Sequence, residues 1–241
     1  MRLAEQGADV VDVGGESTRP GAKPVEPGVE AQRVLPVVEA LASAGVTVSI
    51  DTMRARTARA AVDAGASIVN DVSGGLADAD MAPIVAELEV DFVAMHWRAH
   101  STHMDQRDRY GNVVAEVRDE LAARVDALTA AGVAPERLIL DPGLGFAKVT
   151  DSNWPLLANM DVWSGGHRVL IGASRKRFLG AVVAHDGEEP PGPQGREHAT
   201  TAVTALAAQA GAWAVRVHDV RAACDAIAVA SAWQNASGGP R

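Results

Sequence analysis

Residues 64–69 read Ala-Gly-Ala-Ser-Ile-Val, and the fold class follows from the pattern that they show. A small residue at the end of a helix is followed by glycine, which readily adopts the left-handed conformation there, and then by a short β-branched run. The run is apolar on both faces, as expected of a strand buried in a parallel sheet. The same pattern returns at residues 7–11, 44–48, 131–133 and 210–212.

Seven strands are predicted along the chain, and helical patterns fill the intervals between them. The clearest helix covers residues 113–131, where Val117, Leu121 and Leu128 lie on one apolar stripe. Strand and helix alternate throughout, which predicts an α/β fold with a parallel sheet. The predicted strands are residues 10–13, 46–50, 67–70, 91–95, 137–140, 168–172 and 213–217. The other predicted helices are residues 29–43, 54–63, 79–88, 197–210 and 221–233.

Two folds accommodate such a sheet, the closed TIM (β/α)8-type barrel and the open doubly wound sheet. The sequence opens inside a helical pattern at residues 3–6, with no strand before it. We therefore expect a TIM (β/α)8-type barrel with seven strands visible and its first strand missing. The rhythm continues after a polar stretch at 96–112 and a Pro- and Gly-rich stretch at 185–196. This predicts a single barrel domain over 1–241 with a flexible surface loop at 185–196.

Composition and charge exclude several classes of protein. The hydrophobic share of 47% and the charged share of 22% are typical of a soluble globular protein. A net charge of −9 argues against nucleic acid and anionic membranes as partners. The first residues show no apolar core of the kind found in signal peptides, and the sequence has no apolar run of about 18 residues, as a membrane span requires. The single cysteine, Cys224, allows no disulfide framework, so we expect a cytoplasmic protein.

Polar residues follow the predicted strands at their carboxyl ends, where barrel enzymes keep their active sites. The hydrogen-bond acceptors among them, suited to the N–H donors of a flat heterocycle, are Asp51, Asn70 and Asp141. The side chains suited to an anion are Lys176, Arg216, His218 and Arg19. These residues alone predict a transferase or lyase that acts on a heterocycle carrying phosphate.

Seven segments resemble the signatures of the dihydropteroate synthase family, in the order and with the spacing of that family. They are DVGGESTRPGA (12–22), SIDTMRA (49–55), IVNDVSGG (68–75), MHWR (95–98), LDPGLGFAK (140–148), GASRKRFLG (172–180) and RVHDV (216–220). The resemblance implies a pterin-binding barrel in the folate pathway. Its activity would condense 6-hydroxymethyl-7,8-dihydropterin pyrophosphate with p-aminobenzoate to give 7,8-dihydropteroate and pyrophosphate.

The resemblance also implies a role for each matching residue. Contacts with the pterin would come from Asp51, Asn70, Met95, Asp141, Phe146 and Lys176. Contacts with p-aminobenzoate would come from Thr18, Arg19, Pro20, Ser174 and Lys176. Catalysis would depend on Lys176, Arg216 and His218. Of these, Arg216 and His218 would bind the departing pyrophosphate. Mg²⁺ would assist, but its expected asparagine ligand belongs to a first strand and loop, of the form NVTPDSFSDGG, that this sequence lacks.

Three questions stay open at this stage. The short beginning fits either a misassigned start or a genuine shortened form, and it leaves open whether this form is active. A non-catalytic paralogue, acting as a binding or dimerisation module, is one alternative, and a pterin-binding methyltransferase is another. The methyltransferase has no pyrophosphate to expel, which argues against it. By resemblance we also expect sensitivity to sulfonamides, which mimic p-aminobenzoate, and a homodimer formed near 197–210 and 222–233.

Some polar residues fit a structural role better than a functional one. Asp12 and Asp71 suit caps or turns more than contacts with a ligand. The histidines His96, His100 and His103 resemble a metal cluster, but polar loops collect histidines and no acidic ligand at a known spacing accompanies them.

Overall fold

The computed structural model describes residues 1–17, 25–98, 109–148, 151–185, 187 and 189–237. Seven parallel strands form one sheet, in which each strand pairs with the next one along the chain. The strands are β1 (Val10–Gly14), β2 (Thr47–Asp51), β3 (Ile68–Asp71), β4 (Asp91–Met95), β5 (Leu138–Asp141), β6 (Arg168–Ile171) and β7 (Ala214–Val215). All seven predicted strands are confirmed, with small shifts at their ends.

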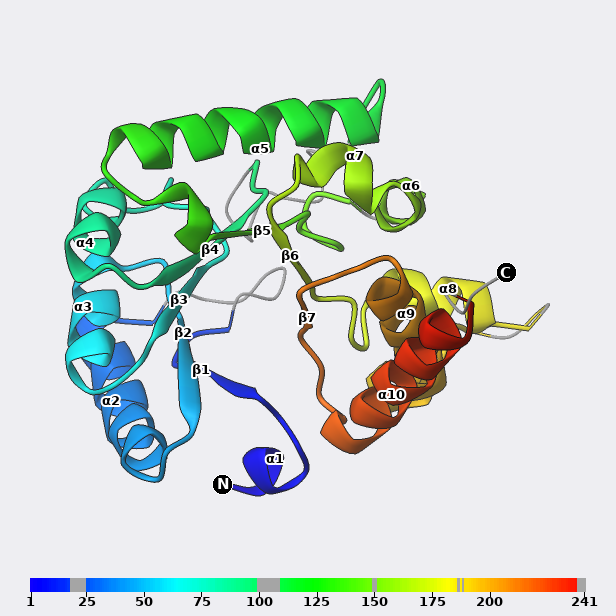
Figure 1. Ribbon diagram of the computed structural model, residues 1–241, viewed down its shortest axis with the longest axis horizontal. Coiled ribbons are helices and arrows are strands. Elements are labelled where there is room, and N and C mark those ends of the chain that lie inside the picture. The colour runs from blue at the N-terminus through cyan, green and yellow to red at the C-terminus, as the bar shows by residue number, and fades with distance from the viewer. Residues whose placement is uncertain (18–24, 99–108, 149–150, 186, 188, 238–241) are drawn as a thin grey trace.

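The sheet curls into a half-barrel, and helices cover its outer face (Figure 1). The α-helices are α1 (Arg2–Glu5), α2 (Pro27–Ser43), α3 (Ala55–Asp63), α4 (Met81–Leu88), α5 (Val113–Ala130), α6 (Asn153–Ala158), α7 (Met160–Ser164), α8 (Arg177–Val183), α9 (Glu197–Gln209) and α10 (Val220–Ser237). Within the described sheet, β1 and β7 are its two ends and do not pair with each other. The predicted α/β fold of the TIM-barrel type, with seven visible strands, is confirmed.

The glycines of the repeated pattern act as the sequence predicts. All five, at positions 7, 45, 65, 132 and 211, have φ between 75° and 109°, the region that favours glycine. Gly65 has a second reason for its lack of a side chain. A Cβ atom there would lie 2.5 Å from Cβ of Ala42, so glycine lets α2 and α3 pack closely.

No pattern in the sequence predicts the short helices α6, α7 and α8, which have five to seven residues. Two turns or fewer cannot show a helical period, which explains the omission. The expected loop at 185–196 ends in the 3₁₀ helix η3 (Pro193–Arg196), where Arg196 donates to the carbonyl of Pro191 at 2.8 Å. The flexibility of this stretch remains a prediction. Among the described helices, none is long and apolar enough to cross a membrane.

Candidate functional site

The inner face of the sheet changes from apolar to polar towards the carboxyl ends of the strands. Its lower layer is packed with the buried aliphatic side chains of Ile68, Val93, Ile139 and Leu170. Because side chains alternate between the faces of a strand, residues two positions further along point into the same interior. Those positions hold Asn70 on β3, Met95 on β4 and Asp141 on β5, all of them buried. Three predicted binding residues therefore share one layer above the apolar core.

Arg216, directly after β7, joins the last strand of the sheet to the first two. Its Nε donates to Oδ2 of Asp12 on β1 at 2.5 Å, and its Nη2 donates to Oδ2 of Asp51 on β2 at 3.1 Å. The side-chain amide of Asn70 donates to the same Asp12 oxygen at 3.2 Å. Strand ends that are far apart in the sequence thus meet in one polar cluster, which includes three of the predicted site residues.

The interpretation of Asp12 as a cap or turn former is wrong, because its carboxylate accepts from Asn70 and Arg216 instead. Its other oxygen, Oδ1, is buried without a hydrogen-bond partner in the described structure. The same interpretation of Asp71 is confirmed. The Asp71 carboxylate accepts from the backbone N–H groups of Ser73 at 2.7 Å and Gly75 at 2.9 Å, which shapes the turn after β3.

The acidic side chains of the cluster have unusual proton affinities. Burial and the charge of Asp12 raise the pKa of Asp51 to about 7, although Arg216 acts in the opposite direction. Burial also raises the pKa of Asp141, and Lys176 opposes that shift. Ionised carboxylates are good acceptors for the N–H donors of a ligand. Near neutral pH, the charge of this cluster therefore depends on pH and on what binds there.

Lys176 lies beside Asp141 and Phe146. Its ammonium donates to the carbonyl of Leu144 and stands 4.7 Å from the centre of the Phe146 ring. A Cβ atom at Gly172 would lie 3.6 Å from Oδ2 of Asp141 and 3.9 Å from Nζ of Lys176. Position 172 therefore lies close to both the carboxylate and the ammonium, which brings these two groups to one part of the site. Burial lowers the pKa of Lys176 to about 8, so the amine is mostly charged at neutral pH.

The loops after β6 and β7 are tied together by Ser174 and His218. The hydroxyl of Ser174 lies 2.8 Å from Nδ1 of His218, and the backbone N–H of His218 donates to that hydroxyl at 3.3 Å. Three of the predicted anion-binding side chains, those of Lys176, Arg216 and His218, thus stand on adjacent loops of one rim. Thr18, Arg19 and Pro20, which were predicted to contact p-aminobenzoate, lie outside the described residues.

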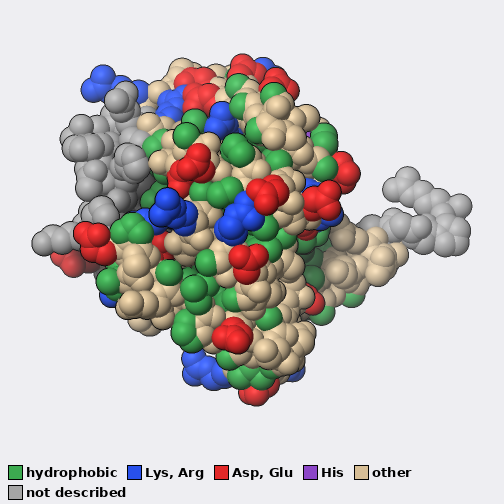
Figure 2. All heavy atoms as spheres, turned by 90° about the vertical axis from the view of Figure 1, so that its left-hand side faces the viewer, with side chains coloured by type: hydrophobic (Ala, Val, Ile, Leu, Met, Phe, Trp, Pro, Cys, Tyr) green, Lys and Arg blue, Asp and Glu red, His purple; other side chains and the backbone are tan. Residues whose placement is uncertain are grey.

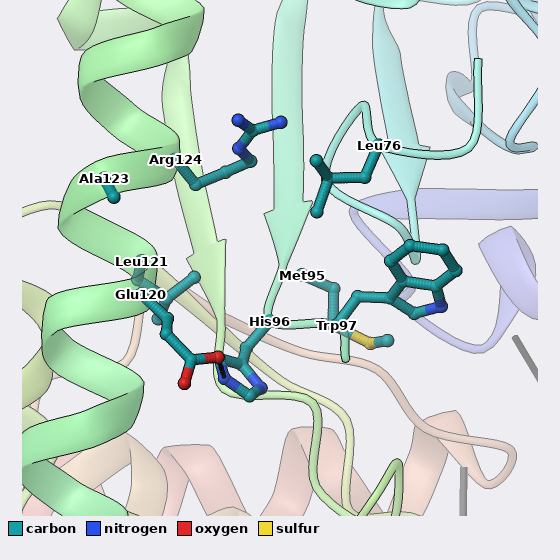
Figure 3. Close-up of a pocket in the computed structure, with 8 residues that line it drawn as sticks. All are labelled: Leu76, Met95, His96, Trp97, Glu120, Leu121, Ala123 and Arg124. Atoms are coloured by element: carbon teal, nitrogen blue, oxygen red, sulfur yellow. Dashed lines mark hydrogen bonds and ion pairs between the residues drawn. The ribbon is translucent and has the colours of Figure 1, made fainter. Parts of the chain in front are cut away.

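A cavity of about 220 Å³ lies outside this cluster, between α5 and the ends of β3 and β4 (Figure 3). Met95 and His96 line it from one side, and Glu120 and Arg124 line it from α5. His96 pairs with Glu120 at 2.9 Å, so it is part of a hydrogen-bonded pair. In the part of the chain that the structure describes, no three His, Cys, Asp or Glu side chains are grouped as a metal site. His100 and His103 lie outside that part.

Comparisons with known proteins identify the family. Residues 1–218 match the family described as "Pterin binding enzyme". The dihydropteroate synthase of Mycobacterium leprae (strain TN) is 56% identical over 239 residues, which cover 98% of this chain and 84% of that protein.

Two solved structures agree with this assignment. Xanthomonas albilineans dihydropteroate synthase with 4-aminobenzoic acid is 41% identical at a TM-score of 0.88, and the match covers 99% of this chain and 83% of that one. Burkholderia cenocepacia dihydropteroate synthase complexed with 7,8-dihydropteroate is 42% identical at a TM-score of 0.89, and the match covers 98% of this chain and 85% of that one. The resemblance seen in the sequence is confirmed, and this chain belongs to the dihydropteroate synthase family of pterin-binding enzymes.

Proposed function

We propose that this chain is a transferase that condenses 6-hydroxymethyl-7,8-dihydropterin pyrophosphate with p-aminobenzoate, giving 7,8-dihydropteroate and pyrophosphate. One structural observation carries the proposal. Buried acceptors on β2, β3 and β5 lie below a rim that holds an ammonium, a guanidinium and an imidazole. This arrangement suits a heterocycle with N–H donors at one end and an anionic leaving group at the other.

The pterin would occupy the layer above the apolar core. The ionised carboxylates of Asp51 and Asp141, with the amide of Asn70, are the groups that would bond its N–H donors and carbonyl. The side chains of Phe146 and Met95 would pack against the pterin ring. The complex of a relative with 7,8-dihydropteroate supports a pterin as the ligand class.

The pyrophosphate would be held by Arg216 and His218, with Lys176 beside the pterin carbonyl. In the structure, the guanidinium of Arg216 is bonded to Asp12 and Asp51. A pyrophosphate would compete with these carboxylates for the guanidinium. Substrate binding would therefore redistribute charge across the cluster as well as fill the space.

The reaction needs positioning and charge more than a covalent intermediate. The amine nitrogen of p-aminobenzoate forms a bond to the pterin methylene carbon while the carbon–oxygen bond to pyrophosphate breaks. The electron pair of that bond leaves with the pyrophosphate, and the amine loses one proton. Carboxylates near the pterin would stabilise the cationic centre, and Arg216 and His218 would stabilise the departing anion.

The p-aminobenzoate would lie towards Ser174, with Lys176 as part of its wall and Thr18, Arg19 and Pro20 completing the site. The relative solved with 4-aminobenzoic acid supports this substrate class. Sulfonamide sensitivity and a cytoplasmic location remain predictions.

Mg²⁺ would be held mainly by the substrate. Mg²⁺ sites commonly combine one or two carboxylates with substrate phosphates and do not need an all-protein cage. The Oδ1 of Asp12, buried without a hydrogen-bond partner in the described structure, fits such a shared site. When bound, the ion would neutralise charge on the leaving pyrophosphate.

The activity is tested by incubating the purified chain with both substrates and Mg²⁺ and following 7,8-dihydropteroate by chromatography. Formation of this product supports the synthase. A folded chain that binds the pterin pyrophosphate and forms no product would favour the non-catalytic alternative.

Asp12→Asn is expected to move the pH dependence of pterin binding to lower pH by about one unit. In the wild type, affinity for 6-hydroxymethyl-7,8-dihydropterin should rise as the pH increases through about 7, where Asp51 ionises. The charge of Asp12 is one cause of the raised pKa, so its removal lets Asp51 ionise at lower pH. Calorimetric titrations across neutral pH, without Mg²⁺ or pyrophosphate, measure the midpoint. The exposed Asp9→Asn is the control, and a midpoint in Asp12→Asn that stays or rises contradicts the assignment.

A homodimer through α9 and α10 also belongs to the proposal. Val229 and Trp233 lie one helical turn apart on α10 with 65% and 69% of their surface exposed, and α9, which packs against α10, exposes Leu206. Helices α2 to α4, which cover the left part of the half-barrel in Figure 1, carry interspersed acidic and basic side chains with scattered hydrophobic ones (Figure 2). The apolar side chains of α9 and α10 are therefore better suited to bury against a second copy.

Trp233→Glu is expected to weaken the dimer at least about tenfold, because the charge would be desolvated in both copies of the interface. Sedimentation velocity over a concentration series measures the change. Val37→Glu, at an exposed apolar position on α2, is the matched control. A wild type that sediments as a monomer, or a Trp233→Glu variant that dimerises as the wild type does, would refute this interface.

A further inference from the structure

The proposed mechanism assigns no task to the buried amine of Lys148, whose pKa is lowered to about 7 by burial. Lys148 has 1% of its surface exposed. Its Nζ donates to the carbonyls of Phe146 at 3.1 Å and Gly143 at 3.3 Å, and it lies 3.0 Å from Nδ1 of His96. A buried amine costs free energy unless its hydrogen bonds compensate for lost water. What Lys148 holds in place is therefore informative.

Lys148 holds the turn between residues 143 and 146. Besides the two carbonyls bonded to Lys148, the carbonyl of Leu144 in this turn accepts from Lys176. The ring of Phe146, at the end of the turn, faces the same Lys176 ammonium. Gly143 has a φ of 66°, and a Cβ atom there would lie 2.5 Å from the carbonyl oxygen of His96. The turn thus connects Lys148 with two groups proposed to contact the pterin.

His96 connects Lys148 to α5. The hydrogen bonds from His96 and Arg98 outweigh the effect of burial and lower the pKa of Glu120 to about 2, so its carboxylate only accepts hydrogen bonds. The imidazole Nε2, 2.9 Å from Glu120 Oε2, must then carry the hydrogen. Its Nδ1 is left to accept from Lys148. Burial and the charge of Lys148 lower the pKa of His96 to about 4, which agrees with a neutral imidazole.

Glu120, at the α5 end of this series of hydrogen bonds, is itself held in place by Arg98. Arg98 donates from Nε to both carboxylate oxygens of Glu120, at 3.1 Å each, and from Nη2 to Glu116 at 2.8 Å. The guanidinium also lies 3.9 Å above the centre of the Tyr110 ring. Figure 3 shows the His96–Glu120 pair between the end of β4 and α5, next to Met95. A continuous path of hydrogen bonds therefore runs from α5 to the turn that carries Phe146.

We propose that Lys148 is a positioning residue, which, together with His96, holds the 143–146 turn so that Phe146 and Lys176 are placed for the pterin. The inference rests on the proposed function and deepens it. It assigns no contact between Lys148 and the substrate. Loss of the positioning by Lys148 should therefore weaken binding of the pterin substrate.

Lys148→Met removes the amine and keeps most of the volume of the side chain. We expect the KM for the pterin pyrophosphate to rise about tenfold, since a displaced positioning group commonly costs one to two orders of magnitude. The KM for p-aminobenzoate should change much less. A purely structural role would lower the amount of active enzyme, and so the apparent kcat, and would leave both KM values unchanged.

Two substitutions of His96 extend the test and cover the case in which Lys148→Met fails to fold. His96→Gln can still accept from Lys148 and donate to Glu120, so it should keep a near wild-type KM for the pterin. His96→Leu can do neither and should raise that KM as Lys148→Met does. Arg118→Met, at an exposed ion pair on the same helix α5, is the control for α5 itself.

The outcomes separate this inference from the proposed function. If the wild type turns over and both Lys148→Met and His96→Leu, folded by circular dichroism, keep its KM for the pterin, the positioning role is refuted while the function stands. If His96→Gln is as impaired as His96→Leu, the hydrogen-bonded path is refuted as well. A wild type without turnover would instead contradict the proposed function.

Discussion

Lys176→Met should reduce the rate of dihydropteroate formation by about a hundred- to a thousandfold, the usual loss when one preorganised donor is removed. The substitution keeps most of the side-chain volume beside Phe146 and deletes the ammonium that stands near Asp141. Loss of this charge also lets the pKa of Asp141 rise further, since Lys176 opposes that rise. Steady-state assays at saturating concentrations of both substrates measure the effect.

The pH profile of the wild type provides a second measure of Lys176. Because its pKa is lowered to about 8, the ammonium loses its proton above that pH. Turnover that depends on the charge should therefore fall as the pH rises through about 8, and this limb should be absent from any residual activity of Lys176→Met. Arg59→Met, at a partly exposed ion pair with Glu87, is the control for a lost surface cation. A loss of turnover in Lys176→Met of less than about threefold would be far smaller than the expected loss. It would show that the ammonium has no part in catalysis.

Arg216→Met should lower kcat/KM for the pterin pyrophosphate by about a hundredfold, because a charge-assisted contact with the leaving group is lost. The substitution has a further effect on the carboxylates. Arg216 lowers the pKa of Asp51, so its removal should move the midpoint of binding of 6-hydroxymethyl-7,8-dihydropterin to a pH above 7. The shift is opposite in sign to that expected for Asp12→Asn.

This pair of opposite shifts distinguishes an electrostatic cluster from general damage to the site. Calorimetric titrations of both variants at matched ionic strength measure it. Arg216→Lys keeps the charge, so its midpoint should shift less than that of Arg216→Met. Part of the shift should remain, because an ammonium cannot reproduce the contact that the guanidinium makes with both Asp12 and Asp51. Midpoints that move in the same direction in Arg216→Met and Asp12→Asn would contradict the proposed coupling.

The strands were predictable from short apolar runs that follow helices, and a glycine with a positive φ ends the helix before β1, β2, β3 and β7. The pattern at 64–69 contains the glycine and the apolar run, and β3 begins at Ile68, one residue after the predicted start. At the other extreme, β7 pairs only through Ala214 and Val215, so its predicted length was too great. The extent of a strand depends on its neighbour in the sheet, which local sequence does not show.

The sequence indicates which strand ends carry the residues of the site. It indicates less well which of these residues contact one another. The position of Asp51, Asn70 and Asp141 at the ends of apolar strands placed them on one rim. The role of Asp12 was missed because its guanidinium partner lies 204 residues further along the chain. Only the curling of the sheet into a half-barrel brings Arg216 to it.

Lys148 shows a further limit of sequence reasoning. It lies within the segment LDPGLGFAK, which supported the family resemblance, and yet no pattern in that segment marks a buried amine. Its partners are backbone carbonyls and His96, which is 52 residues away. Such a residue is found only when burial and hydrogen bonds are known.

The central claim is that this chain couples release of pyrophosphate to formation of the carbon–nitrogen bond. The most direct test is to quantify pyrophosphate and 7,8-dihydropteroate in the same reaction, with the purified chain, both substrates and Mg²⁺. We expect equal amounts of the two products, and neither product when p-aminobenzoate is left out. Pyrophosphate released without p-aminobenzoate, or a folded chain that binds both substrates and forms no dihydropteroate, would contradict the account.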